Sequence, residues 1–375
     1  MTDEYELVAD EPGFSHAISK ISKARRIGLD LESNGFFRYP EQVCLVQIST
    51  PRDVFVIDPL ALEDMKPLGS VLATRKVETV LHAGSHDVLS LDRDWGMHIE
   101  NMFDTNIAAA FVGMSRLGLA NVLEEELGVD IPKEKRIQRS DWSNRPLSQK
   151  ALDYAANDVR YLHELREALG KRLRKLGRED WVKEECQRLS ATRYDPPDPD
   201  MAVFNVKGWR SLDDQGLAIL QSLVDFREDH AVRMGRPHFR VIPDMALITL
   251  ADKPNSDLSR VRGLGNFSRG SMARGIRKAI AEGQSSKPPK RPAQPRQPRI
   301  PRGQREAFSS RLAKLKQWRI ARGKDLSLDP ALIWPMRSLQ RIARAPDKLE
   351  SEMQDPDVRR WQRKEFGKSL RRALA

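Results

Sequence analysis

The segment RIGLDLES, residues 26–33, decides the fold that this sequence predicts. Apolar residues alternate in it with Asp30 and Glu32, and side chains two residues apart in a strand point to the same face. The apolar neighbours favour a buried central strand, in which two carboxylates are costly unless they are paired or bind a metal. An exposed strand with solvated charges is the alternative, because a single D-x-E pattern does not distinguish the two.

Three more apolar runs follow this segment along the chain. QVCLVQIST (42–50) and DVFVIDPL (53–60) come after the turn signals NGFFRYP and TPRD, which predicts an antiparallel meander with the first strand. VETVLHAG (77–84) is a predicted buried strand that leads into a helix at HDVLSLDRDWG. Helical patterns follow in NIAAAFVG (106–113), LANVLEEELG (119–128) and residues 148–177. Strands followed by helices predict an α/β domain with helices packed over a sheet.

Two proline-rich segments divide the chain into domains. RYDPPDPD (193–200) holds three prolines and three acids, which marks a linker. KPPKRPAQPRQPRIPR (287–302) holds six prolines and six basic residues without an acid, so we expect an extended basic tether. The resulting domains are 1–200, 208–284 and 305–375, with a linker at 285–304.

A weak internal repeat relates the two later domains. The first copy is LVDFREDHAVRMGRPHFRVIPDMALITLADKP and the second is LKQWRIARGKDLSLDPALIWPMRSLQRIARAP. Both run from an aromatic-Arg pair through a basic loop to an apolar helix that ends near Ala and Pro. Two copies of a small helical module explain the pattern, and chance likeness between amphipathic helices is the alternative.

Composition and charge restrict the class of protein. No stretch approaches the roughly 20 apolar residues that span a bilayer, and the acidic start MTDEYELVADEPG is unlike a signal peptide. The two cysteines, Cys44 and Cys186, are far apart, so we expect neither a zinc site nor a disulfide framework. These features predict a cytoplasmic protein, and we expect a monomer.

The net charge of +11 is distributed unevenly. Residues 1–200 hold 27 basic and 35 acidic side chains, a charge of −8, so residues 201–375 carry +19. A basic half beside an acidic half is typical of a protein that holds a polyanion with one half and acts on it with the other. Charge that serves only solubility is the alternative.

Other candidate site residues lie on predicted helices. Tyr154 and Asp158 are four residues apart, so they share a helix face that neighbouring apolar residues turn inward. Asp87 lies in the first turn of a predicted helix, where an acid also stabilises the helix terminus. His82 and His86 are possible metal ligands, although hard divalent cations prefer oxygen. Carboxylates gathered in one place need a compensating charge, and two divalent cations are a known device for cutting phosphodiester bonds.

The order of these residues resembles that of a known superfamily. D-x-E on an early strand, Asp87 after HAGSH and Y-x-x-x-D on a late helix are similar to the Tyr-containing subgroup of the DEDD 3′–5′ exonucleases. VCLVQIST, VFVIDPL, LHAGSHDVLSL, FDTNIAAAFVG and SDWSNRPLSQKALDYAANDVRYL resemble the ribonuclease D family, and the likeness covers nearly the whole chain. The modules at 208–284 and 305–375 look like HRDC domains, the second one diverged. The resemblance implies an α/β, ribonuclease H-like exonuclease domain, with a mixed sheet flanked by helices, followed by two small all-α HRDC-type domains.

The resemblance also implies roles for individual residues. Asp30, Glu32, Asp87 and Asp158 would hold two Mg²⁺ or Mn²⁺ ions, while Tyr154 would position the attacking water or take its proton. The enzyme would remove residues from the 3′ ends of tRNA precursors and other structured RNAs and release nucleoside 5′-monophosphates. Two features depart from the family pattern: a histidine precedes Asp87 where an acid is common, and the basic tether is long.

Further side chains are candidates for substrate contacts, each with a structural alternative. They could stack on bases or reach phosphates, and the alternatives are that they anchor loops or form a solvated surface. They are Gln47, His82, Trp142, Arg145, Arg262 and Arg274.

Two other functions fit part of the sequence. The first is a 3′–5′ exonuclease acting on single-stranded DNA, since the same metal site cuts DNA and nothing in the sequence identifies a group that reads the 2′-hydroxyl. The second is a nucleic-acid-binding protein without activity, against which the complete set of four acids and a tyrosine argues.

Overall fold

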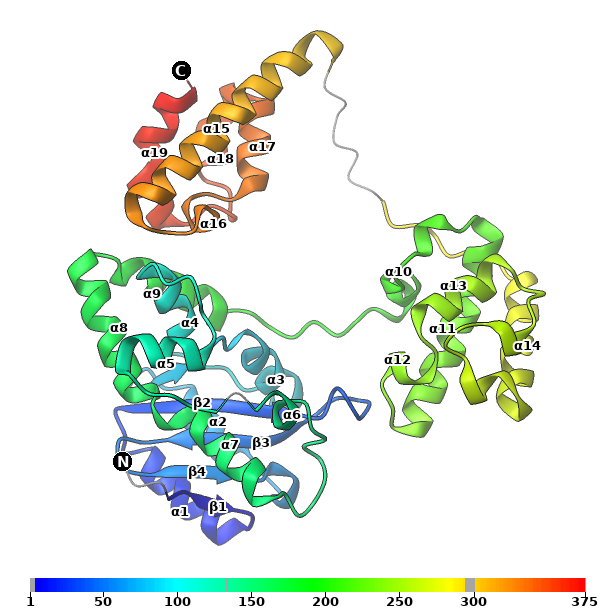
Figure 1. Ribbon diagram of the computed structural model, residues 1–375, viewed down its shortest axis with the longest axis horizontal. Helices are drawn as coiled ribbons and strands as arrows, with labels where there is room; N and C mark the ends of the chain where they lie inside the picture. The colour runs from blue at the N-terminus through cyan, green and yellow to red at the C-terminus, as the bar shows by residue number, and fades with distance from the viewer. Residues whose placement is uncertain (1–3, 133, 294–300, 375) are drawn as a thin grey trace.

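The computed structural model describes residues 4–132, 134–293 and 301–374, and its N-terminal part is built on one mixed sheet (Figure 1). The sheet order is β1-β4-β3-β2-β5-β6. Strands β2, β3 and β4 pair antiparallel, as the meander predicts, whereas β1–β4, β2–β5 and β5–β6 pair parallel. The strands are β1 (Glu6–Val8), β2 (Arg26–Ser33), β3 (Val43–Ser49), β4 (Val54–Ile57), β5 (Glu78–Leu81) and β6 (Met102–Asp104).

Helices cover both faces of this sheet, which confirms the predicted α/β fold (Figure 1). The predicted helical stretch at 148–177 is broken at Tyr161 into α7 and α8, and α7 packs directly on β2, β3 and β4. The helices of this domain are α1 (Glu11–Ile21), α2 (Lys66–Leu72), α3 (Ser85–Trp95), α4 (Thr105–Phe111), α5 (Leu119–Leu127), α6 (Lys135–Gln138), α7 (Gln149–Arg160), α8 (Leu162–Leu176) and α9 (Glu179–Ser190).

The register of the sheet determines which side chains lie on each of its two faces. Asp30 pairs with Gln47 and Glu32 with Leu45, so these side chains share the face that α7 covers. The opposite face carries Leu29 and its apolar neighbours, which pack under α1 and α2. Strand β2 is therefore buried on both faces, and its carboxylates lie between the sheet and α7.

Two helical units follow the sheet domain. The first contains α10 (Ala202–Asn205), α11 (Asp214–Met234), α12 (His238–Val241), α13 (Asp244–Asp252) and α14 (Gly270–Gln284). The second contains α15 (Arg305–Leu326), α16 (Pro330–Ile333), α17 (Met336–Arg344), α18 (Leu349–Glu352) and α19 (Arg360–Leu374). The two copies of the repeat fold alike, because a long helix, a four-residue helix and a nine-residue helix follow one another in each unit. Part of the predicted tether, residues 294–300, lies outside the described residues.

The second unit packs on the sheet domain and shares its core. Phe111 of α4, Trp181 of α9 and Trp361 of α19 belong to one hydrophobic cluster, in which the two indole rings stack at 4.6 Å. Arg359 pairs with Glu185 of α9 at 3.0 Å. Some basic residues of this unit therefore neutralise acids of the sheet domain.

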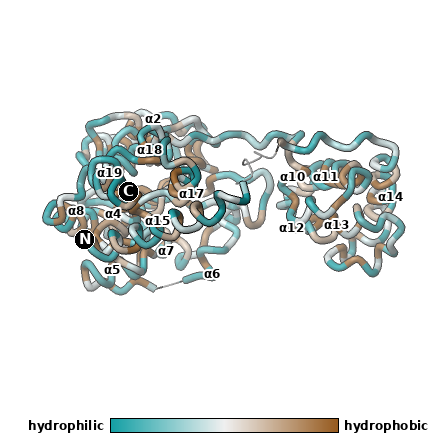
Figure 2. Tube along the Cα trace, turned by 90° about the horizontal axis from the view of Figure 1, so that it is seen from above, coloured by the Kyte–Doolittle hydropathy of each residue, from teal (hydrophilic) through white to brown (hydrophobic). Residues whose placement is uncertain are grey.

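The first unit stands to one side and approaches the sheet domain at a loop (Figures 1 and 2). This loop, residues 34–42, joins β2 to β3. Tyr39 from the loop donates a hydrogen bond of 2.7 Å to Glu228 of α11, and its ring lies 4.5 Å from that of His238. In the described ranges, no helix combines the length and apolar character needed to cross a membrane.

Candidate active site

Three carboxylates from two elements meet between the sheet and α7. Asp30 and Glu32 of β2 and Asp158 of α7 each offer an oxygen atom, and these atoms lie within 4.8 Å of one another. Such an all-oxygen donor set suits a hard divalent cation of the Mg²⁺ or Mn²⁺ type.

A glycine makes this close approach possible. A Cβ atom on Gly28 would lie 2.3 Å from the hydroxyl oxygen of Ser49 and 3.2 Å from the carbonyl oxygen of Val159. The Ser49 hydroxyl donates a buried hydrogen bond of 2.8 Å to that carbonyl. Because Val159 follows Asp158, this bond holds the Asp158 end of α7 against β2 and β3.

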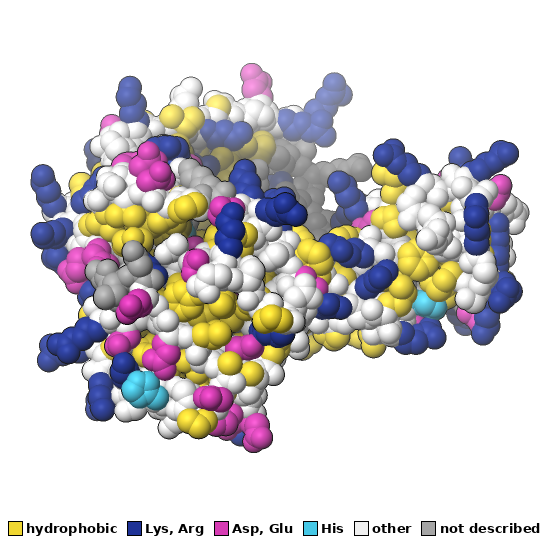
Figure 3. Space-filling model, turned by 60° about the horizontal axis from the view of Figure 1, so that its bottom comes forward, with side chains coloured by type: hydrophobic (Ala, Val, Ile, Leu, Met, Phe, Trp, Pro, Cys, Tyr) yellow, Lys and Arg dark blue, Asp and Glu magenta, His cyan; other side chains and the backbone are white. Residues whose placement is uncertain are grey.

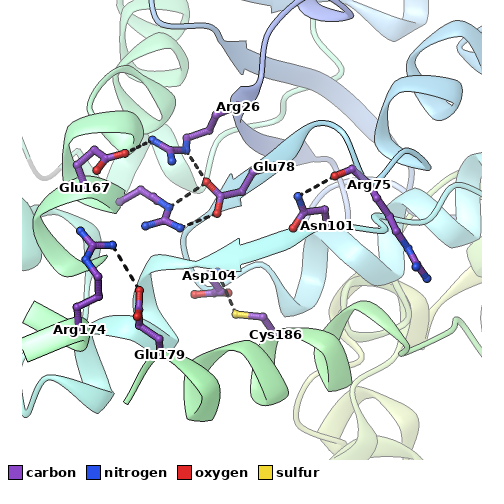
Figure 4. Close-up of polar contacts among 10 residues, drawn as sticks. Arg26, Arg75, Glu78, Asn101, Asp104, Glu167, Arg174, Glu179 and Cys186 are labelled. Atoms are coloured by element: carbon purple, nitrogen blue, oxygen red, sulfur yellow. Dashed lines mark hydrogen bonds and ion pairs between the residues drawn. The ribbon is translucent and has the colours of Figure 1, made fainter. Parts of the chain in front are cut away.

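Asp87 reaches the same region from the first turn of α3, directly after the β5–α3 turn. It is 7% exposed, and its charge helps to raise the pKa of Glu32. The turn is held by Asp104, which accepts hydrogen bonds from the backbone N–H groups of Ala83 at 3.2 Å and Gly84 at 2.8 Å. Asp104 also caps the N-terminus of α4, and its own N–H donates to the Cys186 thiol (Figure 4). The structure thus brings the fourth predicted acid beside the other three.

Burial and repulsion between the acids raise their pKa values. Burial, followed by repulsion from Asp158, raises the pKa of Asp30 well above its ordinary value, and burial together with the other three acids does the same for Glu32. Burial and then Asp30 raise the pKa of Asp87, and burial raises the pKa of Asp158 to about 7. Four clustered carboxylates, buried or half-buried and with raised pKa values, are expected at a site that binds cations.

Tyr154 lies one helical turn before Asp158 and forms a hydrogen bond with its side chain. Burial, and then the charges of Asp158, Glu32 and Asp30, raise the pKa of the phenol above its ordinary value. Trp142 packs against the tyrosine ring, with centroids 6.3 Å apart. The five residues of the family pattern therefore lie together.

The loop before α7 is fastened to the sheet by Arg145. Its guanidinium pairs with Asp58 and donates to the carbonyl oxygens of Cys44 and Trp142. Trp142 itself is 1% exposed. The Arg145 guanidinium is bound by groups of the protein and the Trp142 ring is buried, so their geometry favours the loop-anchoring alternative over contact with substrate.

The histidines also have structural partners. The ring nitrogens of His82 lie 2.9 Å from the Thr105 hydroxyl and 2.9 Å from the Leu117 carbonyl oxygen, and burial lowers its pKa. Both ring nitrogens of His82 thus have partners within the protein, which argues against its acting as a metal ligand. His86 lies at the rim, where it pairs with Glu41 at 3.1 Å; this contact is the main cause that lowers the pKa of Glu41 to about 2.

The remaining predicted contacts divide between a buried and an exposed set. Gln47 is fully buried beside Asp30, and within the described ranges its amide has no hydrogen-bond partner. Its side chain is shielded from solvent, so it does not face a bound RNA strand. Arg262 and Arg274 are exposed on the first helical unit, whose α14 lies on the side away from the sheet domain (Figures 1 and 2).

An ion-pair network supports the sheet behind the site (Figure 4). Glu78 of β5 accepts hydrogen bonds from Arg26 of β2 and, at 2.7 Å, from Arg166 of α8, while Arg26 also reaches Glu167. These contacts hold the parallel pair β2–β5, which carries Asp30 and leads to Asp87.

Three residues of this site were missed by the sequence reasoning: Gly28, Asp58 and Asp104. The first is visible as the one glycine of the central strand. The two acids follow apolar runs, in FVID and MFD, but nothing in the sequence identifies the backbone groups and the arginine that they bind.

Comparison with known proteins places the chain in a family. A family model described as 3′–5′ exonuclease matches residues 5–174. Ribonuclease D of Granulibacter bethesdensis is 32% identical over 88% of this chain and 82% of its own length. Ribonuclease D of Pseudomonas paraeruginosa is 29% identical over 99% of this chain and 98% of its own. The crystal structure of Escherichia coli RNase D superposes with a TM-score of 0.71 at 23% identity, covering 99% of this chain and 98% of that one, which shows the shared fold. The chain belongs to the ribonuclease D family.

Proposed function

We propose that this 3′–5′ exoribonuclease removes 3′-terminal residues from tRNA precursors and other structured RNAs by hydrolysis that depends on two divalent cations, releasing nucleoside 5′-monophosphates. The meeting of the Asp30, Glu32 and Asp158 oxygens within 4.8 Å carries this proposal. Membership of the ribonuclease D family supports it, as does the basic second half of the chain.

The four acids would hold the cations. Asp30, Glu32 and Asp158 share one cluster, and Asp87 borders it. When bound, Mg²⁺ or Mn²⁺ would supply activation of the attacking water and stabilisation of charge on the leaving 3′ oxygen. Their binding would also relieve the repulsion between the carboxylates, which explains why the fold tolerates four acids in a buried site.

Tyr154 would position the attacking water. Its raised pKa keeps the phenol protonated near neutral pH, so its hydroxyl is better suited to orient a water by hydrogen bonding than to take a proton as phenolate. Its hydrogen bond to Asp158 and its contact with the Trp142 ring fix it in place. Of the two roles that the family resemblance leaves open, the geometry favours positioning.

The two helical units would bind the RNA as HRDC-type domains. Arg262 and Arg274 are exposed, and in the described residues neither guanidinium has a hydrogen bond or ion pair, which suits phosphate contacts. Binding should weaken steeply with salt, because phosphate contacts release counterions. The thiols of Cys44 and Cys186 are free and buried, which is consistent with a reducing cytoplasm, where we propose that the protein acts.

The test is incubation of the purified protein with a precursor tRNA that carries a 3′ extension, in Mg²⁺, in Mn²⁺ and in EDTA. We expect nucleoside 5′-monophosphates from the 3′ end in either metal and none in EDTA. Matched RNA and DNA oligonucleotides, run in parallel, decide between the two polymers. Equal rates in EDTA, or products other than 5′-mononucleotides, would overturn the proposed chemistry.

A further inference from the structure

We propose that Phe37, Phe239 and Arg240 form a site for unpaired nucleotides of the RNA, a few positions before its 3′ end; this inference rests on the proposed function. Phe37 belongs to the β2–β3 loop of the catalytic domain, and Phe239 and Arg240 belong to α12 of the first helical unit. The site therefore exists only where the two domains meet.

Hydrogen bonds around the proposed site hold the β2–β3 loop against the first helical unit. Tyr39 bonds Glu228 through its hydroxyl and the carbonyl oxygen of Gly235 through its backbone N–H. Glu228 also pairs with His238, the residue before Phe239. These contacts order the loop against α12 and leave the neighbouring Phe37 and Arg240 in a defined position.

Arg240 is the centre of the proposed site. Its guanidinium carbon lies 4.4 Å from the centroid of the Phe37 ring and 5.9 Å from that of Phe239. In the described parts of the chain, no carboxylate and no carbonyl oxygen binds this guanidinium, and the side chain is exposed. An arginine stacked on an aromatic ring keeps its N–H groups free for phosphate oxygens.

Phe239 is exposed to an extent that a purely structural role does not explain, whereas Phe37 is half-buried. Phe239 leaves 56% of its surface in solvent. Bases of single-stranded RNA stack on such rings irrespective of sequence. The segment around them, HAVRMGRPHFRVIP at 230–243, contains three arginines and no acid, so its charge complements a polyanion.

The position fits the end of a substrate strand. Phe37 is five residues after Glu32, so their Cα atoms are at most about 18 Å apart. The bond between Ser33 and Glu41, at 2.5 Å, closes the base of the loop next to the acids. Helix α12 lies on the side of its unit that faces the catalytic domain, whereas α14 lies on the far side (Figures 1 and 2).

The helical unit therefore offers two basic regions with different roles. Lys and Arg side chains are spread over the face of this unit that Figure 3 shows. The α12 region would hold the unpaired 3′ strand on its way to the acids. The region of Arg262 and Arg274 would hold more distant parts of the RNA.

The test uses the full chain and two RNAs, a hairpin with a ten-nucleotide 3′ tail and a dinucleotide too short to span both sites. We expect Phe239→Ala and Arg240→Ala each to raise KM for the tailed RNA by at least about 5-fold, with kcat and dinucleotide cleavage unchanged. Arg240→Lys should restore only part of the affinity, because a lysine lacks the planar stacking group. Ile320→Ala, which shortens a comparably exposed side chain on α15, is the matched control and should leave both substrates unaffected.

The outcomes of these measurements decide the inference. An unchanged KM for the tailed RNA, or an equal loss on both substrates, would overturn it. If the wild-type protein cleaved no RNA, the proposed function would fail, but the binding of a fluorescent oligoadenylate in EDTA would still decide on this site. In that measurement, equal Kd values for wild type and Arg240→Ala contradict the inference, and a higher Kd for Arg240→Ala supports it.

Discussion

The hydroxyl of Ser49 donates a hydrogen bond of 2.8 Å to the carbonyl oxygen of Val159, in the space left by the missing side chain of Gly28. This contact joins the middle of the sheet to the helix that carries Asp158. Because Gly28 has no Cβ atom, α7 can pack closely on β2, and Asp158 can lie near the β2 acids.

The first prediction follows from this contact. Gly28→Ala would push a methyl group into the Ser49 hydroxyl and the backbone of α7, so we expect a loss of about 1–3 kcal/mol in the free energy of unfolding. Exonuclease activity should fall more than stability alone explains, because α7 and Asp158 must shift. Gly303→Ala is the control, since its Cβ would meet no atom within 4 Å. Urea denaturation and initial rates check both; a fully active Gly28→Ala protein would show that the close approach is unimportant.

Asp30→Asn tests the candidate cation site. The amide keeps the shape of the carboxylate but removes a charged oxygen ligand, so we expect cleavage to fall by about 10³-fold or more. The affinity for RNA, measured in EDTA, should change by less than about 2-fold, because phosphate contacts lie elsewhere. Asp153→Asn, on the exposed side of α7, should behave as wild type. Undiminished cleavage by Asp30→Asn would remove this residue from the site.

Tyr154→Phe tests the positioning role. The variant keeps the ring that packs on Trp142 and loses only the hydroxyl. We expect kcat to fall by about 10²-fold with little change in KM, the size typical of a group that assists proton transfer or orients a water. Steady-state kinetics on the tailed hairpin separate the two constants. A raised KM with normal kcat would instead indicate that the tyrosine binds substrate.

The cation-free protein should lose stability as the pH rises. The pKa values of Asp30, Glu32, Asp87 and Asp158 are all raised by folding, so the folded chain binds protons more tightly than the unfolded chain. The free energy of unfolding in EDTA therefore decreases from about pH 4, where free carboxyls titrate, through pH 7, near the pKa of Asp158.

Urea denaturation at pH 5 and pH 8 measures this effect. Mg²⁺ should restore stability at pH 8, and Asp30→Asn should flatten the dependence in EDTA because it removes one of the repelling charges. A protein that is equally stable at both pH values in EDTA contradicts the assigned cluster.

The sequence predicts the parts of the fold that depend on local periodicity. Alternation places Asp30 and Glu32 on one face, and the spacing of four residues places Tyr154 beside Asp158. Strands β1 and β6 have only three residues each, so they are too short to show an alternating pattern in the sequence. They form because β1 pairs parallel with β4 and β6 pairs parallel with β5. Asp104 was missed for a different reason, since its role depends on N–H groups twenty residues earlier in the chain.

The position of the second helical unit was equally beyond sequence reasoning. Its helices are amphipathic, but periodicity does not show whether an apolar face closes on its own unit or on another. The basic charge of this region favoured RNA binding, while the structure shows that Arg359 pairs with Glu185 and that Glu184 accepts hydrogen bonds from the backbone of Arg360 and Trp361. A basic composition can therefore serve docking as well as nucleic-acid binding.

The last prediction concerns this docked unit. Trp361 is 4% exposed, stacks on Trp181 and donates a hydrogen bond of 2.9 Å from its indole to Glu185. We expect Trp361→Ala to lower the free energy of unfolding by about 3–5 kcal/mol, the usual cost of emptying such a site. Because the cluster also contains Phe111 of the catalytic domain, thermal inactivation of the exonuclease should shift together with the melting of the helices.

Ile320→Ala, on an exposed face of the same unit, should change the free energy by less than about 0.5 kcal/mol. Circular dichroism and residual activity after heating give the two readouts. If the second unit were an independent RNA-binding module on a tether, Trp361→Ala would weaken RNA affinity and leave the thermal inactivation of the exonuclease unchanged. The shared core leads us to expect the opposite: loss of the tryptophan destabilises the catalytic domain, whose helices α4 and α9 lose their cover.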